Sequence, residues 1–197
     1  MVFCWVALIF TSGINIYVLL ATCIIGSSFL AYLIIYVPRF DYIQGRIVSF
    51  FNREIGTHNF QSDKAIESIT SGGFFGKGIG EGVLKNRVPE AHTDYIISVI
   101  SEEFGVVAIM LILLLFLILI YMVFKKISFE TNDKAKLILI GSISLILMQA
   151  TIHVGVNIRL FPTTGMTLPF LSYGGSSIIS TSILAGIILN LTKRKIT

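Results

Sequence analysis

The sequence predicts an all-α fold, a polytopic helical bundle that crosses a membrane about four times. Hydrophobic residues make up 54% of the 197-residue chain and charged residues only 13%. This composition excludes an ordinary soluble globule and a disordered chain. Four long segments contain no charged residue: 1–38, 104–124, 137–158 and 170–191. Because a helix needs about 20 apolar residues to cross a bilayer, each of the last three can supply one span within a single membrane domain.

The first uncharged segment is longer than one span requires. We interpret residues 1–11 as the remnant of one span and about 14–37 as a complete one, and we expect the others at about 96–124, 137–157 and 172–191. The start lacks the basic region of a cleavable signal peptide. A membrane protein that begins inside an apolar run looks like part of something longer.

Two short basic segments predict the orientation of the chain. One runs from Lys125 to Lys136, and the other is the tail from Lys193 to Lys195. The positive-inside rule places both in the cytoplasm, and two predicted spans separate them, as that placement requires. The C-terminus is then cytoplasmic and the long loop of about 39–95 extracytoplasmic. The net charge of +4 fits this topology, and no basic stripe with interleaved aromatic residues indicates nucleic acid.

The loop of about 39–95 is long enough to need structure of its own. Its first part carries apolar residues at helical spacing with arginines between them, which predicts a short amphipathic helix at the membrane surface. The residues are Ile43, Ile47, Phe50 and Phe51, with Arg46 and Arg53. A second short helix is expected to start near Ser62 or Asp63 and to run to about Ile69.

A glycine-rich run follows that second helix. Its members are Gly72, Gly73, Gly76, Gly78, Gly80 and Gly82. The P-loop pattern fails, because Ser71 stands where its first glycine is required and Gly78 follows Lys77. A dinucleotide-binding turn fails too, because no strand precedes the run. Either the glycines permit positive φ in a flexible loop, or their backbone approaches a substrate headgroup with Lys77 near a phosphate.

Asp94 stands where a polar segment meets an apolar stretch of membrane length. A carboxylate at that place is costly to keep near lipid and usually has a function. We expect Thr93 to be the N-cap, which would place Asp94 in the first helical turn, where the dipole favours the ionised form. Asp94 then either complements the dipole or acts as a general base toward a sugar hydroxyl. His92 is adjacent in sequence and would not face Asp94 on a helix, and the histidines lack metal-ligand spacing.

Two further features lie in the last two predicted spans. Gln149, His153 and Asn157 recur every four residues and should face the protein interior, where they either form interhelical hydrogen bonds or line a substrate path. Gly175 and Ser176 open the last helix. The free N–H groups of a helix N-terminus bind anions, so a pyrophosphate could dock there; close packing through small residues is an equal alternative.

Three motifs in order closely resemble the SEDS family, the shape, elongation, division and sporulation proteins FtsW, RodA and SpoVE. They are SGGFFGKGIGEG at 71–82, VPEAHTDYIISVISEEFG at 88–105 and FPTTGMTLPFLSYGGSS at 161–177. The chain is most similar to the C-terminal half of the division member, FtsW. Phe60 and Gln61 also match an aromatic–Gln pair of that family.

The resemblance implies a peptidoglycan glycosyltransferase of bacterial cell division that polymerises lipid II at the outer face of the inner (plasma) membrane. The family's catalytic aspartate falls on Asp94, the base for the acceptor 4-hydroxyl. Substrate binding is expected at Gln61, Lys77, Gly78, His92, Thr93, Tyr173, Gly175 and Ser176. The implied partners are a class B penicillin-binding protein, other division proteins and membrane lipids. No dedicated carboxylate cage for a metal is visible, although Mg²⁺ could help neutralise the leaving diphosphate.

Alternatives stay open because only half of the family's fold is represented. A split gene, or a degraded or mis-started reading frame, would leave this polypeptide inactive on its own. A transporter of the lipid-linked precursor is one alternative function, motivated by the stripe of Gln149, His153 and Asn157. A non-catalytic scaffold fragment of the division machinery is another, motivated by the missing half.

Overall fold

The computed structural model describes residues 2–51, 57–83, 87 and 90–193. Across these ranges the chain forms helices and no strand, so the predicted all-α fold is confirmed. The elements are α1 (Val2–Thr11), α2 (Ile16–Tyr36), the 3₁₀ helix η1 (Pro38–Phe40), α3 (Asp41–Phe51), α4 (Thr57–Gly72), α6 (Ile96–Phe129), α7 (Asp133–Asn157) and α8 (Gly175–Thr192).

Four of these helices, α2, α6, α7 and α8, are long and apolar enough to cross a membrane. Many of their large apolar side chains point outward, among them Ile25, Leu114 and Ile179. Outward apolar side chains suit a surface that meets lipid, because the helices satisfy their own backbone polar groups. α1 is too short to span and packs along α7, where Leu8 lies against Gly141.

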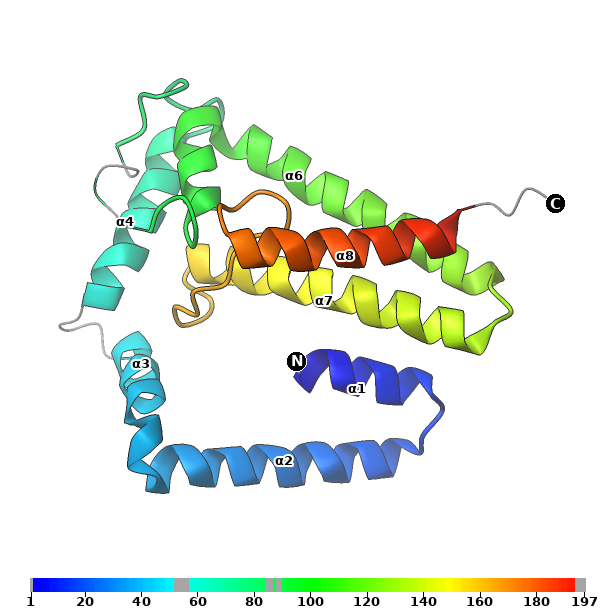
Figure 1. The fold of residues 1–197 in the computed structure, drawn as a ribbon. Coiled ribbons are helices and arrows are strands. Elements are labelled where there is room, and N and C mark those ends of the chain that lie inside the picture. The colour runs from blue at the N-terminus through cyan, green and yellow to red at the C-terminus, as the bar shows by residue number, and fades with distance from the viewer. Residues whose placement is uncertain (1, 52–56, 84–86, 88–89, 194–197) are drawn as a thin grey trace.

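The three C-terminal spans form the bundle (Figure 1). α7 packs against both α6 and α8 through a buried apolar cluster that includes Leu139, Ile143 and Ile146. α2 lies at the edge of the molecule (Figure 1) and contacts α1, η1 and α3. Buried apolar clusters therefore join α6, α7 and α8, and a further cluster brings Ala65 of α4 against Tyr95, Val99 and Val156. The N-terminal hairpin of α1 and α2 contacts the bundle through α1.

The long loop contains both of the short helices expected of it. α3 turns away from the end of α2, and α4 stands at the left end of the bundle in Figure 1, where it packs on the first turns of α6. α4 begins earlier and ends later than the predicted 62–69. Its end coincides with Gly73, whose φ of 58° is a left-handed conformation common just beyond helix ends.

α6 is interrupted at Gly105, which has φ 79° and ψ 179°. The glycine run docks its backbone on this break: Lys77 N donates to Glu102 O (2.9 Å), Gly78 N to Glu103 O (3.1 Å) and Val106 N to Gly73 O (3.0 Å). These bonds satisfy backbone groups that the break leaves without helical partners. A Cβ on Gly105 would lie 2.1 Å from Phe74 O, so the close approach requires glycine.

The glycine run thus combines features of both interpretations given above. Positive φ is present at Gly73, Gly76, Gly78 and Gly80, as the structural interpretation predicted. The close backbone approach is made to α6. An approach to a substrate headgroup stays a prediction.

Candidate active site around Asp94

Asp94 lies in a turn just ahead of α6. The expectation that Thr93 caps this helix is wrong, because α6 begins at Ile96 with Tyr95 in the N-cap position and without a side-chain cap. The Thr93 hydroxyl donates back to the Glu90 carbonyl (3.1 Å), and the amide of Asp94 donates to the same oxygen (3.0 Å). These bonds close a turn, and Asp94 consequently lies outside the first helical turn in which we expected it.

Three consecutive main-chain carbonyls hold this turn in place, those of residues 92 to 94. Tyr173 N donates to His92 O (3.1 Å), Ser172 Oγ to Thr93 O (2.7 Å) and Asn157 Nδ2 to Asp94 O (3.0 Å). The donors come from the end of α7 and from the connection between α7 and α8, which we call the 158–174 loop. The backbone of Asp94 is therefore fixed from outside its own segment.

The polar stripe on α7 organises the 158–174 loop. Gln149 Nε2 donates to Thr167 O (2.9 Å) and to Ser177 Oγ on α8 (3.1 Å), and His153 Nδ1 lies 2.7 Å from Met166 O. Farther along the stripe, the Asn157 side chain accepts from the hydroxyl of Ser98 on α6 (2.7 Å).

His153 and Asn157 are almost completely buried. The expectation of interhelical hydrogen bonds is confirmed for Gln149 and Asn157. The path-lining alternative stays a prediction.

The Asp94 carboxyl is half-buried beside glycine and charged groups. A Cβ on Gly165 of the 158–174 loop would lie 3.5 Å from its Oδ2. Burial, followed by hydrogen bonding and charge repulsion from Glu90, raises the pKa of Asp94 to about 6. Thr93 and the positive charge of Arg46 act in the opposite direction. The carboxyl is thus partly desolvated and still ionised at neutral pH.

A hollow of about 420 Å³ lies beside this turn, lined by His92, Ile96, Leu171 and Tyr173. It brings together two of the predicted substrate-binding residues, His92 and Tyr173. α8 begins at Gly175, as expected, and Ser176 is exposed in its first turn. Diphosphate binding at that helix start stays a prediction.

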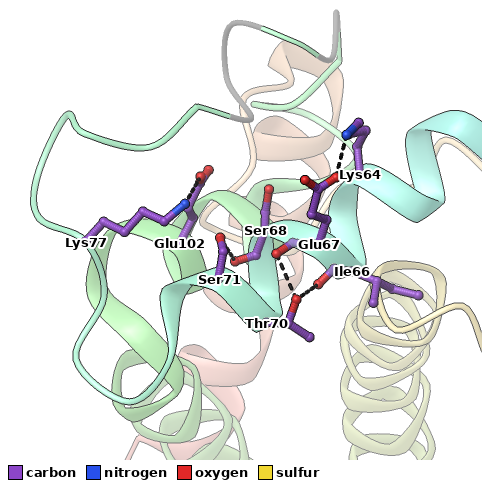
Figure 2. Close-up of polar contacts among 8 residues, drawn as sticks. All are labelled: Lys64, Ile66, Glu67, Ser68, Thr70, Ser71, Lys77 and Glu102. Atoms are coloured by element: carbon purple, nitrogen blue, oxygen red, sulfur yellow. Dashed lines mark hydrogen bonds and ion pairs between the residues drawn. The ribbon is translucent and has the colours of Figure 1, made fainter.

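Lys77 pairs with the buried carboxylate of Glu102 (Figure 2). Its Nζ lies 3.0 Å from Glu102 Oε1, and the Glu102 side chain is only 3% exposed. A buried carboxylate needs a partner of opposite charge, so Lys77 has a structural task at the break in α6. A phosphate contact through Lys77 or Gly78 stays a prediction.

Gln61 lies on α4, partly buried. Its neighbour Ser62 faces the site, with its hydroxyl 3.4 Å from the phenolic oxygen of Tyr95. Within the described residues, no group of three His, Cys, Asp or Glu side chains could hold a metal ion. Val88 and Pro89 of the Asp94 motif lie outside the described residues.

A second cavity, of about 470 Å³, opens between α6 and α7. It is lined almost wholly by apolar side chains and extends from Ile97 and Leu168, near the Asp94 turn, to Leu119 and Ile143 in the bundle. Its chemistry suits a hydrocarbon chain.

The sequence did not single out two charged neighbours of the site, Arg46 and Glu90. Arg46 was assigned only to the polar face of a surface helix, and Glu90 only to a motif. Glu90 lies near Asp94 because the two residues share the 90–94 turn. Arg46 lies near the site because of the packing of α3, for which local sequence spacing carries no signal.

The family model described as "Cell cycle protein" (FtsW, RodA, SpoVE) matches residues 1–196. A probable peptidoglycan glycosyltransferase FtsW from Enterococcus hirae is 38% identical over 160 residues, which are 80% of this chain and 40% of the relative. Stage V sporulation protein E from Bacillus subtilis (strain 168) is 34% identical over 192 residues, covering 95% of this chain and 51% of the relative. The chain thus spans about half the length of these curated relatives.

A solved structure agrees with the sequence matches. It comes from work on the structural coordination of polymerization and crosslinking by a peptidoglycan synthase complex. The TM-score is 0.70 at 26% sequence identity, over 97% of this chain and 52% of the solved chain. The similarity therefore extends over both the spans and the long loop.

Proposed function

The chain belongs to the FtsW/RodA/SpoVE family of cell cycle proteins, and on that premise we propose that it forms the C-terminal part of a peptidoglycan glycosyltransferase. Its four apolar helices and its family make it a multi-pass membrane protein. Relatives that carry the name probable peptidoglycan glycosyltransferase FtsW support the activity.

The reaction joins two lipid-linked sugars, and Asp94 acts in it as general base. The carboxylate takes the proton of the acceptor 4-hydroxyl as that oxygen bonds to the donor anomeric carbon. The bond between that carbon and the undecaprenyl pyrophosphate breaks, and the pyrophosphate leaves with the electron pair. The substrate class is lipid II.

The single observation that carries this proposal is the state of the Asp94 carboxyl. It is half-buried and its pKa is raised to about 6, while its backbone is fixed by Asn157. A base is most effective when its pKa lies near the working pH and its position is fixed. The pKa of about 6 leaves most of the carboxyl ionised at pH 7.

The surroundings suit the rest of the substrate. The hollow at His92 and Tyr173 adjoins the Asp94 turn, and the N–H groups that open α8 at Gly175 suit the diphosphate. The apolar cavity between α6 and α7 suits a polyprenyl chain. We place the Asp94 side outside the cytoplasm, the C-terminus inside, and a class B penicillin-binding protein as partner.

The test is the substitution Asp94→Asn in native membranes, where any completing polypeptide is present. We expect glycan synthesis from labelled lipid II to be lost while membrane insertion is kept. Asp133→Asn is the matched control, because Asp133 begins α7 and its side chain is 90% exposed. Wild-type synthesis by Asp94→Asn would refute the proposal.

A further inference from the structure

Arg46 reaches the Asp94 site from a helix far away in the sequence. It lies on α3, where its guanidinium stacks over the Tyr42 ring at 4.3 Å and its Nη1 donates to Thr163 O at 2.8 Å. Its Nε atom is buried. The stacking and the carbonyl bond together fix the long side chain in one direction, toward the 158–174 loop.

The bond from Arg46 falls close to the reactive carboxyl. Thr163 stands two residues before Gly165, and the Cβ position of Gly165 lies 3.5 Å from Asp94 Oδ2. The positive charge of Arg46 also acts on Asp94 and on the neighbouring Tyr95. Arg46 therefore touches the loop that covers Asp94 and is electrostatically linked to the carboxyl.

The geometry points to Arg46 as a positioning residue of the Asp94 site, which clamps the 158–174 loop over the carboxylate and stabilises its ionised form. This inference rests on the proposed function, because it concerns the group proposed as the base. Two side-chain charges oppose each other at Asp94: Glu90, from the preceding turn, favours the protonated carboxyl, and Arg46, from α3, favours the carboxylate. The Tyr95 phenol is the other titratable neighbour.

A second arginine offers a natural comparison. Arg159, at the end of α7, also ties the 158–174 loop to the long segment, through an ion pair with Asp63 of α4. That pair matches charge with charge. Arg46 instead donates to a main-chain carbonyl of the loop, and its positive charge acts on Asp94. If both arginines only hold the loop in place, replacing either one should have a similar effect on the ionisation of Asp94. Our inference predicts that only the replacement of Arg46 changes this ionisation.

The test reads the ionisation of Asp94 without any enzymatic assay. A hydrophobic carbodiimide modifies protonated carboxyls, so its rate of attachment to Asp94, located by mass spectrometry in membranes containing the protein, falls as the pH rises through the pKa. In the wild type we expect a midpoint at about pH 6. Asp94→Asn supplies the blank.

For Arg46→Gln we expect the midpoint to move up by about half a unit or more, because a stabilising positive charge is lost. For Arg46→Lys, which keeps the charge and loses the planar fork, we expect a smaller upward shift. Arg159→Gln should leave the midpoint at the wild-type value. An unchanged or lowered midpoint in Arg46→Gln overturns the inference. If that variant does not fold, a shift in Arg159→Gln equal to that in Arg46→Lys overturns it.

The experiments distinguish a failure of the inference about Arg46 from a failure of the proposed function. If Asp94→Asn still synthesises glycan, Asp94 is not the general base, whatever the carbodiimide midpoints show. Loss of synthesis in Asp94→Asn together with equal midpoints in wild type and Arg46→Gln removes only the role of Arg46. If Asp94 is the base and Arg46 positions it, the rate of glycan synthesis in Arg46→Gln should fall on the acidic side at a higher pH than in the wild type. This displacement should match that of the labelling midpoint.

Discussion

The side-chain amide of Asn157 donates a 3.0 Å hydrogen bond to the main-chain carbonyl of Asp94. The same side chain donates to His153 O (2.8 Å) and accepts from both the amide and the hydroxyl of Ser98. Asn157 has no exposed surface. One buried amide thus joins the last turn of α7 to the start of α6 and to the backbone of the proposed base.

Asn157→Ala should weaken both the fold and the site. It removes four hydrogen bonds at once, and at about 0.6 kcal/mol for each bond in a membrane protein we expect a loss of about 2 kcal/mol in the free energy of unfolding. Because Asp94 then loses a constraint on its position, glycan synthesis should also fall at temperatures where the variant is folded. Thermal unfolding in detergent and synthesis in native membranes measure the two effects.

Thr151→Ala is the matched control on the same helix. The Thr151 side chain is exposed, and its hydroxyl bonds to Leu147 O of its own helix (2.8 Å). We expect a change within about 0.5 kcal/mol. Equal losses of stability in the two variants would contradict the role given to Asn157.

Gly105→Ala should disrupt the junction between α6 and the glycine run. Its φ of 79° strains any residue with a side chain, and a Cβ there would lie 2.1 Å from Phe74 O. Neither strain nor overlap can be relieved without moving backbone, so we expect a loss of about 3 kcal/mol or more. Thermal unfolding in detergent checks this loss.

Gly186→Ala provides the comparison, because Gly186 lies within α8 and nothing stands within 4 Å of its Cβ position. There alanine should be neutral or stabilise the helix by up to about 1 kcal/mol. The account of the α6 break fails if Gly105→Ala is as stable as Gly186→Ala.

Periodicity and charge predicted the helices, because a lipid-facing span needs only length and apolar composition. The four spans and the two short helices of the long loop follow from such local signals. The stripe of Gln149, His153 and Asn157 was also visible, because polar residues on one face of a span must point inward.

The parts that sequence did not reveal depend on contacts between distant segments. Thr93 has the chemistry of an N-cap, but its hydroxyl bonds to Glu90 O instead, and the helix starts later. The glycines at 72–82 fit α6 only because Gly105 breaks that helix, which no helical pattern indicates. Arg46 reaches the 158–174 loop beside Asp94 through tertiary packing, and its spacing in α3 predicted only a polar helix face.

Lys77→Met should be costly, because it removes the cation that lies 3.0 Å from the buried Glu102 carboxylate. Breaking one side of a buried ion pair costs about 3 kcal/mol, and the Glu102 side chain is only 3% exposed. Thermal unfolding at pH 7.5 measures the loss. The large loss is predicted from structure alone, whether or not Lys77 also contacts substrate.

Lys64→Met tests the same change at an exposed pair. Lys64 pairs with Glu67 one turn along α4, and the Glu67 side chain is 60% exposed (Figure 2). The pairing lowers the pKa of Glu67, but solvent screens an exposed pair, so its contribution to stability is small. If Lys64→Met loses as much stability as Lys77→Met, burial of the Glu102 carboxylate does not explain the cost of removing Lys77.

Asp94→Asn should stabilise the fold at high pH while it removes the proposed activity. The pKa of Asp94 is about 6 in the folded protein against an ordinary value of 3.8, so folding favours the protonated form. That stabilising contribution is complete below about pH 4 and is lost as the pH rises through 6. Asparagine avoids the loss, and after allowance for solvent screening we expect a gain of about 1 kcal/mol at pH 8 and almost none at pH 4.

Thermal unfolding of wild type and Asp94→Asn across pH 4 to 8 measures this difference. The two curves should diverge as the pH rises through about 6, where the folded carboxyl ionises. Asp133→Asn should show no such gain, because its side chain is 90% exposed at the start of α7, where a negative charge is favourable. A stability difference between wild type and Asp94→Asn that is independent of pH would mean that Asp94 ionises as readily in the folded protein as in the unfolded chain.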